Sequence, residues 1–185
     1  MAEPRDTIEI VNVVASTSIG QEINLNQVVR ALEGADYDPE RFPGLVYRTK
    51  NPKTAALLFR SGKIVCTGGK GVDEAYRGIE NVFQSLRNIG IDVRRTQEIK
   101  VQNIVASANL NSPLNLNAVA IGLGLENVEY EPEQFPGLVY RMSDPKVVIL
   151  LFGSGKLVIT GGRKPADVTN AVDQIVRDLK RVSLI

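Results

Sequence analysis

The sequence predicts an α+β fold made of two pseudo-symmetric repeats, with an antiparallel sheet and helices on one side of it. Residues 42–69 and 135–162 match at a constant offset of 93, and 19 of their 28 positions are identical. Apolar runs separated by short breaks predict strands, and one long amphipathic stretch in each copy predicts a helix. Because the chain contains a duplicated unit, a residue kept in both copies is expected to serve the same role twice.

The duplication extends beyond this stretch. Residues 12–16 correspond to 103–107 at an offset of 91. The second copy is therefore two residues longer between this segment and the matched stretch, where a surface loop can absorb the insertion. We expect the repeats to span 6–95 and 96–185. They should form one continuous domain, because the junction at 94–98 lacks the Pro, Gly or Ser run of a flexible linker.

Each copy should contain a strand, a short helix, three antiparallel strands and a long helix, in that order. Short connections require the antiparallel arrangement. In the first copy we predict strands at 8–16, 44–50, 54–60 and 63–67, an Asn24-capped helix at 25–33, a break at Asn51-Pro52, a hairpin turn at Ser61-Gly62, a long helix at 72–88 and an edge strand near 91–95. The second long helix should run from near Pro165 to about Val182.

Composition excludes several classes of protein. The single cysteine, Cys66, cannot form an intramolecular disulfide and fits a reducing compartment. The sequence shows no apolar run long enough to span a membrane and no signal peptide, so we expect the cytoplasm of a cell without a nucleus, or a nucleus. There is no His, no phosphate-binding loop motif and no Cys or His cluster for zinc. We therefore expect neither catalysis nor a metal or other cofactor.

Charge is unevenly distributed, although the net charge is only +1. Residues 41–70 contain seven basic side chains and no acidic one, and residues 134–166 contain five basic side chains and one acidic one. An acidic run precedes the second basic stretch, at Glu126, Glu129, Glu131 and Glu133. Because salt screens charges over about 8 Å, a nearly neutral protein can still present separate basic and acidic surfaces.

The predicted strands are apolar on both faces, as at 54–59 and 147–152, although one long helix per copy can cover only one face. A large uncovered apolar face usually marks an interaction site. That face could instead be buried in a homodimer or beneath a loop. Basic residues flanking the strands in both copies favour DNA, and apolar residues with Asn and Thr suit the minor groove. On strand periodicity the face holds Asn12, Val14, Leu57, Phe59, Val65 and Thr67, and then Asn103, Val105, Leu150, Phe152, Val158 and Thr160.

With these residues in hand, the chain resembles the TATA-box-binding proteins over essentially its whole length. The resemblance rests on a pattern that occurs twice. FPGLVYR is followed by a Pro, then by LLF, SGK and a Val, and finally by TGG. The short N-terminus and the near-identity of the copies are typical of the archaeal branch, which would place the protein in the archaeal nucleoid. The resemblance implies a saddle with one curved ten-stranded antiparallel sheet as its concave face and four helices on its convex face.

The resemblance also implies roles for individual residues. The intercalating pairs would be Phe42 with Phe59 and Phe135 with Phe152. Residues that touch bases or line the minor groove would be Asn12, Val14, Leu57, Val65, Thr67, Asn103, Val105, Leu150, Val158 and Thr160. Phosphates would be met by Arg48, Ser61, Lys63, Arg141, Ser154 and Lys156. This family is itself the standard example of proteins that wedge apolar side chains into the minor groove and kink the duplex.

The implied function is that of a general transcription initiation factor that binds and bends double-stranded DNA at a TATA box. Glu131 and Glu133 would face transcription factor B, and RNA polymerase would join within the preinitiation complex. A rival interpretation is a pseudo-symmetric scaffold that buries its apolar face on another protein, without sequence-specific bending of DNA. The sequence leaves open whether the free protein forms a homodimer through that face.

Overall fold

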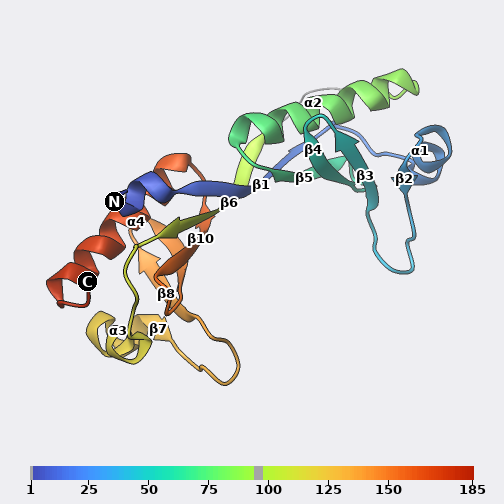
Figure 1. Cartoon of the computed structure of the whole chain (residues 1–185). Coiled ribbons are helices and arrows are strands. Elements are labelled where there is room, and N and C mark those ends of the chain that lie inside the picture. The colour runs from blue at the N-terminus through green and yellow to red at the C-terminus, as the bar shows by residue number, and fades with distance from the viewer. Residues whose placement is uncertain (1, 94–97) are drawn as a thin grey trace. The chain divides into compact units, whose positions relative to one another are not determined.

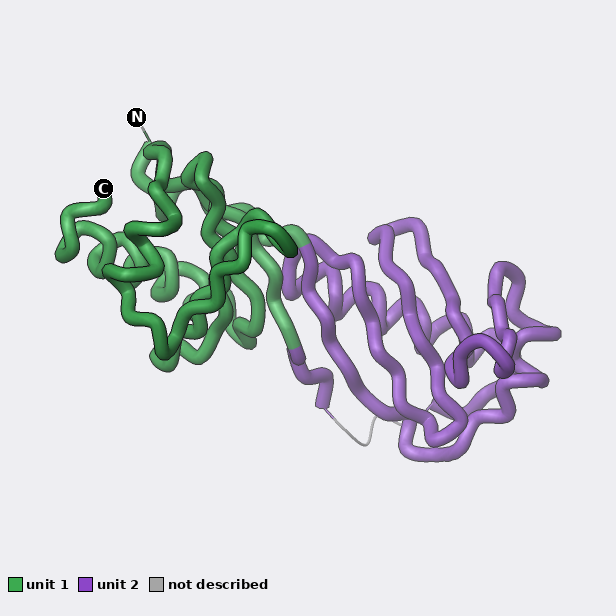
Figure 2. Tube along the Cα trace, turned by 90° about the horizontal axis from the view of Figure 1, so that it is seen from below, with its two compact units in different colours: residues 1–11, 103–185 green, residues 12–102 purple. Residues whose placement is uncertain are grey.

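The computed structural model describes residues 2–93 and 98–185. Contacts between Cα atoms divide the chain into two compact units, Asn12–Gln102 and Met1–Val11 with Asn103–Ile185 (Figure 2). They are called here the first half and the second half. The predicted boundary between the repeats, at residues 95 and 96, lies outside the described residues and stays a prediction.

The first half is built on antiparallel strands in the order β2-β3-β4-β5-β1 (Figure 1). The sheet follows from short connections, which allow only antiparallel pairing between consecutive strands. The elements are β1 (Glu9–Ser18), α1 (Leu25–Ala31), β2 (Ala35–Asp36), β3 (Leu45–Lys50), β4 (Lys53–Leu58), β5 (Lys63–Gly69) and α2 (Val72–Asn88).

The second half has the corresponding order, β6-β10-β9-β8-β7. Its elements are β6 (Lys100–Asn109), α3 (Leu116–Leu123), β7 (Val128–Glu129), β8 (Leu138–Ser143), β9 (Lys146–Leu151), β10 (Lys156–Gly162) and α4 (Pro165–Arg181), with single-turn helices η1 (Pro4–Thr7) and η2 (Leu125–Asn127). The predicted α+β class, with ten antiparallel strands and four α-helices in the described residues, is confirmed.

Local sequence accounts for the helix ends. Asn24 caps α1 by accepting the backbone N–H of Gln27 at 3.2 Å, and Asn115 caps α3 by accepting that of Ala118 at the same distance. Each bond satisfies one of the N–H groups that the first turn of a helix leaves without a partner. α4 begins at Pro165, whose fixed φ suits the first helical position.

The core of each half lies between its sheet and its long helix, where α2 packs on β4 and β5, and α4 packs on β9 and β10 (Figure 1). Alternate strand residues such as Leu58, Ile64 and Cys66 are fully buried against α2, together with Phe83. Burying one large aliphatic side chain stabilises the fold by about 1.5–3 kcal/mol. The helices therefore cover one face of each sheet, and the residues between these buried positions lie on the other.

Several predicted bounds differ from the observed ones. α1 ends at Ala31 rather than at residue 33, because Leu32 is already extended. β4 ends at Leu58, since the Phe59 N–H closes the hairpin on the Lys63 carbonyl at 2.9 Å. Residues 91–93 form no strand, and the rest of the predicted edge strand lies outside the described residues. β2 and β7 were not predicted, because two residues are too short to show periodicity.

Candidate nucleic-acid interface

Each half presents one open sheet face, which carries the predicted apolar residues. The open face of the first half is defined by the half-buried Val14, Leu57, Val65 and Thr67, and that of the second half by Val105, Leu150, Val158 and Thr160. Most of their strand neighbours, such as Ala56, Leu58 and Ile149, are buried on the helix side, whereas Gly68 and Gly161 are exposed. The predicted placement of these residues on the face opposite the long helix is therefore confirmed within each half, where their side chains are only half-buried.

The strand register adds residues that the sequence analysis missed. Val46 pairs with Leu57, which pairs with Val65, so the three form one row across the open face. In the second half Val139 pairs with Leu150 in the same way. Applying the two-residue alternation to residues 44–50 and 137–143 would have found both valines. They widen the apolar surface toward the edge of each sheet.

Two phenylalanine pairs stand at the hairpin ends of these faces. The ring centroids of Phe42 and Phe59 lie 5.9 Å apart at 66°, and those of Phe135 and Phe152 lie 5.8 Å apart at 68°. Phe42 is 38% exposed and Phe135 is 40% exposed. Such edge-to-face pairs gain about 0.5–1.5 kcal/mol beyond burial of their area. The two rings of each pair therefore pack against each other, and one of the two is exposed to solvent.

Local backbone bonds place these rings. The Phe42 N–H donates to the Asp38 carbonyl and the Phe135 N–H donates to the Glu131 carbonyl, each at 3.0 Å. Gly44 lies beneath the first pair, where an added Cβ would come within 2.7 Å of the Phe42 ring. An added Cβ at Gly137 would lie equally close to the Phe135 ring. The Phe-Pro-Gly sequence therefore provides both the ring and the space that the ring occupies.

The two predicted base-contacting asparagines are held by a glycine in the neighbouring strand. The Asn12 Oδ1 accepts the Gly68 N–H at 2.7 Å, and the Asn103 Oδ1 accepts the Gly161 N–H at 2.6 Å. Both glycines have positive φ, +96° and +98°, and the pairing register shifts beside them, as in a β-bulge. With Oδ1 engaged, the amide Nδ2 is the group left to donate a hydrogen bond.

Threonines adjoin these asparagines. The Thr67 hydroxyl donates to Asn12 Oδ1 at 3.3 Å, and the Thr160 hydroxyl accepts one of the two hydrogens of Asn103 Nδ2 at 3.2 Å. The structure thus brings each predicted asparagine and threonine together. Asn12 thereby pins a bulge in the neighbouring strand, which also fixes the orientation of its amide.

The predicted phosphate-contacting residues are all exposed: Arg48, Ser61, Lys63, Arg141, Ser154 and Lys156. The serines cap their hairpin turns, and each accepts an N–H two residues further on at 3.4 Å. The arginines differ. Arg141 forms an ion pair with Glu129 at 3.4 Å, whereas Arg48 has no ion pair within residues 2–93 and 98–185.

The predicted partner-facing acids, Glu131 and Glu133, are exposed in the loop that carries Phe135. The Glu131 carbonyl holds the Phe135 N–H, so this loop joins an acidic surface to an apolar ring. Neither carboxylate forms an ion pair with another described residue. Both charges are therefore available to an external partner.

The family model described as transcription factor TFIID, or TATA-binding protein, TBP, matches residues 7–89 and 98–182. The chain belongs to this family. TATA-box-binding protein E of Halobacterium salinarum is 64% identical over 185 residues, which is all of both chains. The TATA-box-binding protein of Archaeoglobus fulgidus is 58% identical over 178 residues, covering 96% of this chain and 97% of its own.

A solved structure of Methanococcus jannaschii TBP has the same fold. It superposes with a TM-score of 0.84 at 53% sequence identity, and covers 94% of this chain and 98% of its own. The TATA-binding family resemblance inferred from the duplicated Phe-Pro-Gly stretch is thereby confirmed. The family match falls into two segments, one over each copy of the duplication.

The described residues contain no group of three His, Cys, Asp or Glu side chains arranged to hold a metal ion. In the same residues no helix is long and apolar enough to cross a membrane. Burial raises the pKa of the Cys66 thiol, although a hydrogen bond with Thr54 lowers it in part. Such a thiol is a poor nucleophile.

Proposed function

We propose that the protein is a general transcription initiation factor that binds the minor groove of a TATA box and bends the duplex. The observation that carries this proposal is the edge-to-face phenylalanine pair beside the open apolar face of each half, in which one ring, Phe42 or Phe135, is exposed. Each pair wedges into a base step at one end of the site. Partial unstacking costs a few kcal/mol per base step. The additional protein surface that bent DNA covers offsets this cost.

The open faces select A·T pairs. In the minor groove A·T and T·A pairs present only acceptors, whereas G·C adds the amino donor of guanine. The amides of Asn12 and Asn103 donate from Nδ2, because each Oδ1 is held by a bulge glycine. They match A·T acceptors and oppose the guanine amino group. The valines and leucines of the open faces pack on the floor of the groove.

Sequence selection also has an indirect part. Pyrimidine–purine steps such as TA unstack more readily than others, so a wedge favours sites that place such steps at its ends. The exposed basic residues and the hairpin serines contact phosphates, which positions the duplex without reading its sequence. These contacts give binding a strong dependence on salt, because they release counterions.

Both repeats, 6–95 and 96–185, would contact the same duplex. The acidic loop with Glu131 and Glu133 then binds transcription factor B, and RNA polymerase joins the assembled complex. Both carboxylates are exposed and without ion pairs to described residues, which supports this role. The protein would work in the compartment that holds the DNA, the nucleoid of an archaeal cell.

Binding to three duplexes of equal length tests the proposal. The first carries a TATA box, the second a G·C box, and the third an inosine·C box, which lacks the guanine amino group in the minor groove. We expect tight binding to the TATA box, weak binding to the G·C box and recovery with inosine·C. Equal affinity for all three would contradict minor-groove recognition and favour the protein-scaffold interpretation.

A further inference from the structure

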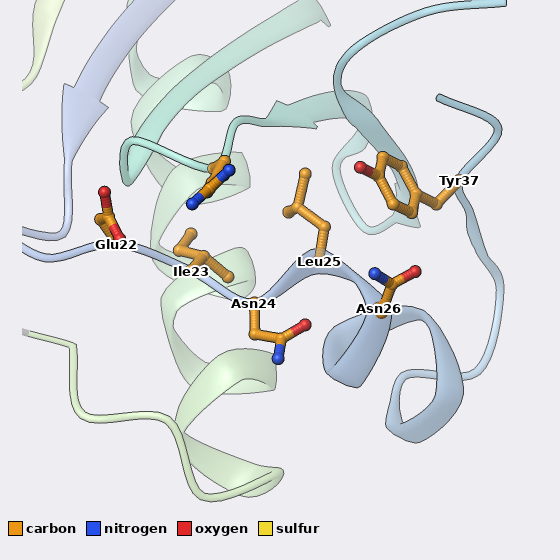
Figure 3. Close-up of a pocket in the computed structure, with 7 residues that line it drawn as sticks. Glu22, Ile23, Asn24, Leu25, Asn26 and Tyr37 are labelled. Carbon is orange, nitrogen blue, oxygen red and sulfur yellow. The ribbon is translucent and has the colours of Figure 1, made fainter. Parts of the chain in front are cut away.

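The first half contains an open polar pocket that the DNA-binding role described above does not use. Its volume is about 530 Å³, and its polar lining comes from Glu22, Asn24, Asn26, Tyr37 and Arg60. Figure 3 shows Glu22 on one side of the pocket, and Asn26 with Tyr37 on the other. The lining joins the start of α1, the residue after β2 and the β4–β5 hairpin.

The chemistry of this pocket suits an anion. The Asn24 Oδ1 already accepts the Gln27 N–H at 3.2 Å, and its amide Nδ2 can donate to a ligand. Asn26 and the Tyr37 hydroxyl add further donors. Arg60 supplies a full positive charge and has no ion pair within the described part of the chain. One carboxylate, Glu22, opposes these groups.

The position of Arg60 indicates which kind of anion the pocket would bind. It lies in the chain between Phe59, the proposed wedge, and Ser61, a proposed phosphate contact. The Arg60 carbonyl accepts the Ile23 N–H at 2.9 Å, which ties the segment before α1 to this hairpin. A duplex wedged by Phe59 would continue past the same hairpin. The nearest anions available there are the phosphates of the flanking DNA.

The second half lacks this arrangement. Gly153 stands at the position of Arg60, and Pro113 stands at the position of Glu22. The surrounding charge also differs. Residues 35–63 contain six basic and three acidic side chains, whereas residues 128–156 contain three basic and four acidic ones. In addition, Arg141 is tied to Glu129, while Arg48 has no such partner within the described residues. The two halves are therefore electrostatically unequal where their sequences are otherwise most alike.

We propose that the first half carries an additional phosphate-binding site, formed by Arg60 and the donors of its pocket, for duplex DNA that extends beyond the Phe42–Phe59 wedge. The second half has no counterpart. This inference rests on the proposed function and extends it: affinity should depend on flanking DNA at one end of the box more than at the other.

Reciprocal substitutions between the halves test the site. Wild type, Arg60→Gly and Gly153→Arg are compared on a flanked TATA duplex and on a short duplex that ends at the wedged steps, across a salt series. Gly153 accepts a side chain, because an added Cβ would meet only the Leu114 carbonyl, at 3.8 Å. Arg177→Gln on α4 is the control for loss of one exposed charge.

On the flanked duplex Arg60→Gly should weaken binding about fivefold at low salt and reduce the salt slope by about 0.9, the value for one lost phosphate contact. Gly153→Arg should increase that slope, and Glu22→Gln should tighten binding. Arg60→Lys, which keeps the charge, should retain most of the slope. On the short duplex Arg60→Gly and wild type should bind alike, and Arg177→Gln should match wild type on both duplexes.

Two results would overturn the site. An unchanged salt slope for Arg60→Gly on the flanked duplex would show that Arg60 meets no phosphate. An equal loss on both duplexes would place Arg60 at the box itself. In either case wild type would still prefer the TATA duplex, so the proposed function would stand. Failure of the proposed function would appear separately, as wild type that binds the TATA and G·C duplexes equally.

Discussion

The Asn12 side-chain oxygen lies 2.7 Å from the backbone nitrogen of Gly68, and Asn103 repeats the relationship with Gly161 at 2.6 Å. Both bonds are made where a positive-φ glycine interrupts the ladder between two strands. Only an acceptor can sit on these N–H groups, so the bulge decides which end of the amide faces outward. The backbone of one strand thereby sets the hydrogen-bonding polarity of a side chain on its neighbour.

Asn12→Asp should therefore weaken binding to a TATA duplex more than Asn12→Ala does. The aspartate keeps the bond to Gly68 but presents a second acceptor, with a negative charge, to the acceptors of A·T pairs. We expect a loss of at least about tenfold, or about 1.4 kcal/mol, in titrations by fluorescence anisotropy. Equal losses for the two variants would show that the donor is not what faces the DNA. Thermal unfolding checks that both variants remain folded.

Gly44→Ala should impair DNA bending with little effect on stability. The added methyl would lie 2.7 Å from the Phe42 ring and 3.1 Å from the Phe59 ring. Phe42 is partly exposed and can move aside, but it then leaves its edge-to-face position. Fluorescence transfer across a labelled TATA duplex would measure the loss of bending. Gly153→Ala is the matched control, since its Cβ meets ordinary contacts only. Normal bending by Gly44→Ala would contradict a role for the ring geometry.

Phe83→Ala and Phe42→Ala should separate a core phenylalanine from a binding one. Phe83, on α2, is fully buried, whereas Phe42 is 38% exposed. Truncating a fully buried Phe costs about 3–5 kcal/mol in unfolding free energy, and we expect this for Phe83. Phe42→Ala should cost about 1 kcal/mol or less, comparable to the aromatic pair it breaks, while reducing affinity for DNA. Chemical denaturation measures the stability terms. A large stability loss for Phe42→Ala would make it a core residue.

Cys66 provides a pH-dependent test of the core. Burial raises the pKa of its thiol above the ordinary value of 9.0. Above that ordinary value the unfolded chain releases the thiol proton while the folded chain retains it, so this group lowers stability as pH rises through and beyond 9.0. Because the Cys66 thiol is buried, the native protein should react slowly with a thiol reagent, whereas the unfolded protein should react rapidly. Wild type should also lose more stability between pH 8 and 10 than Cys66→Ala. Fast labelling of the native protein would contradict burial.

Much of the fold could be predicted because its signals are local and repeated. The bounds of α2 follow from an uninterrupted apolar stripe, and the hairpins follow from their turn residues. β2 and β7 could not be predicted, since strands of two residues carry no periodicity of their own. They form because Ala35 and Val128 find partners in β3 and β8, respectively.

The residues of the site were predictable, but their geometry was not. The resemblance to the TATA-box-binding proteins implied both Phe pairs, and strand periodicity placed both asparagines on the open face. The edge-to-face contact and the bond from a bulge glycine to each asparagine depend on residues more than fifteen positions apart, which sequence spacing does not resolve. The ion pair that engages Arg141 was missed because its partner, Glu129, lies on β7, a strand too short to be predicted. Val46 and Val139 could have been found by extending the alternation.

Bending of a TATA duplex with a fluorescent pair at its ends tests the wedge mechanism most directly. Wild type, Phe152→Ala and Phe59→Ala are compared at saturating protein across a salt series, with a G·C duplex as the control. We predict that wild type shortens the end-to-end distance on the TATA duplex and that each variant loses a large part of that change. Saturation of the TATA duplex by wild type without shortening, or full bending by both variants, would contradict the wedge mechanism.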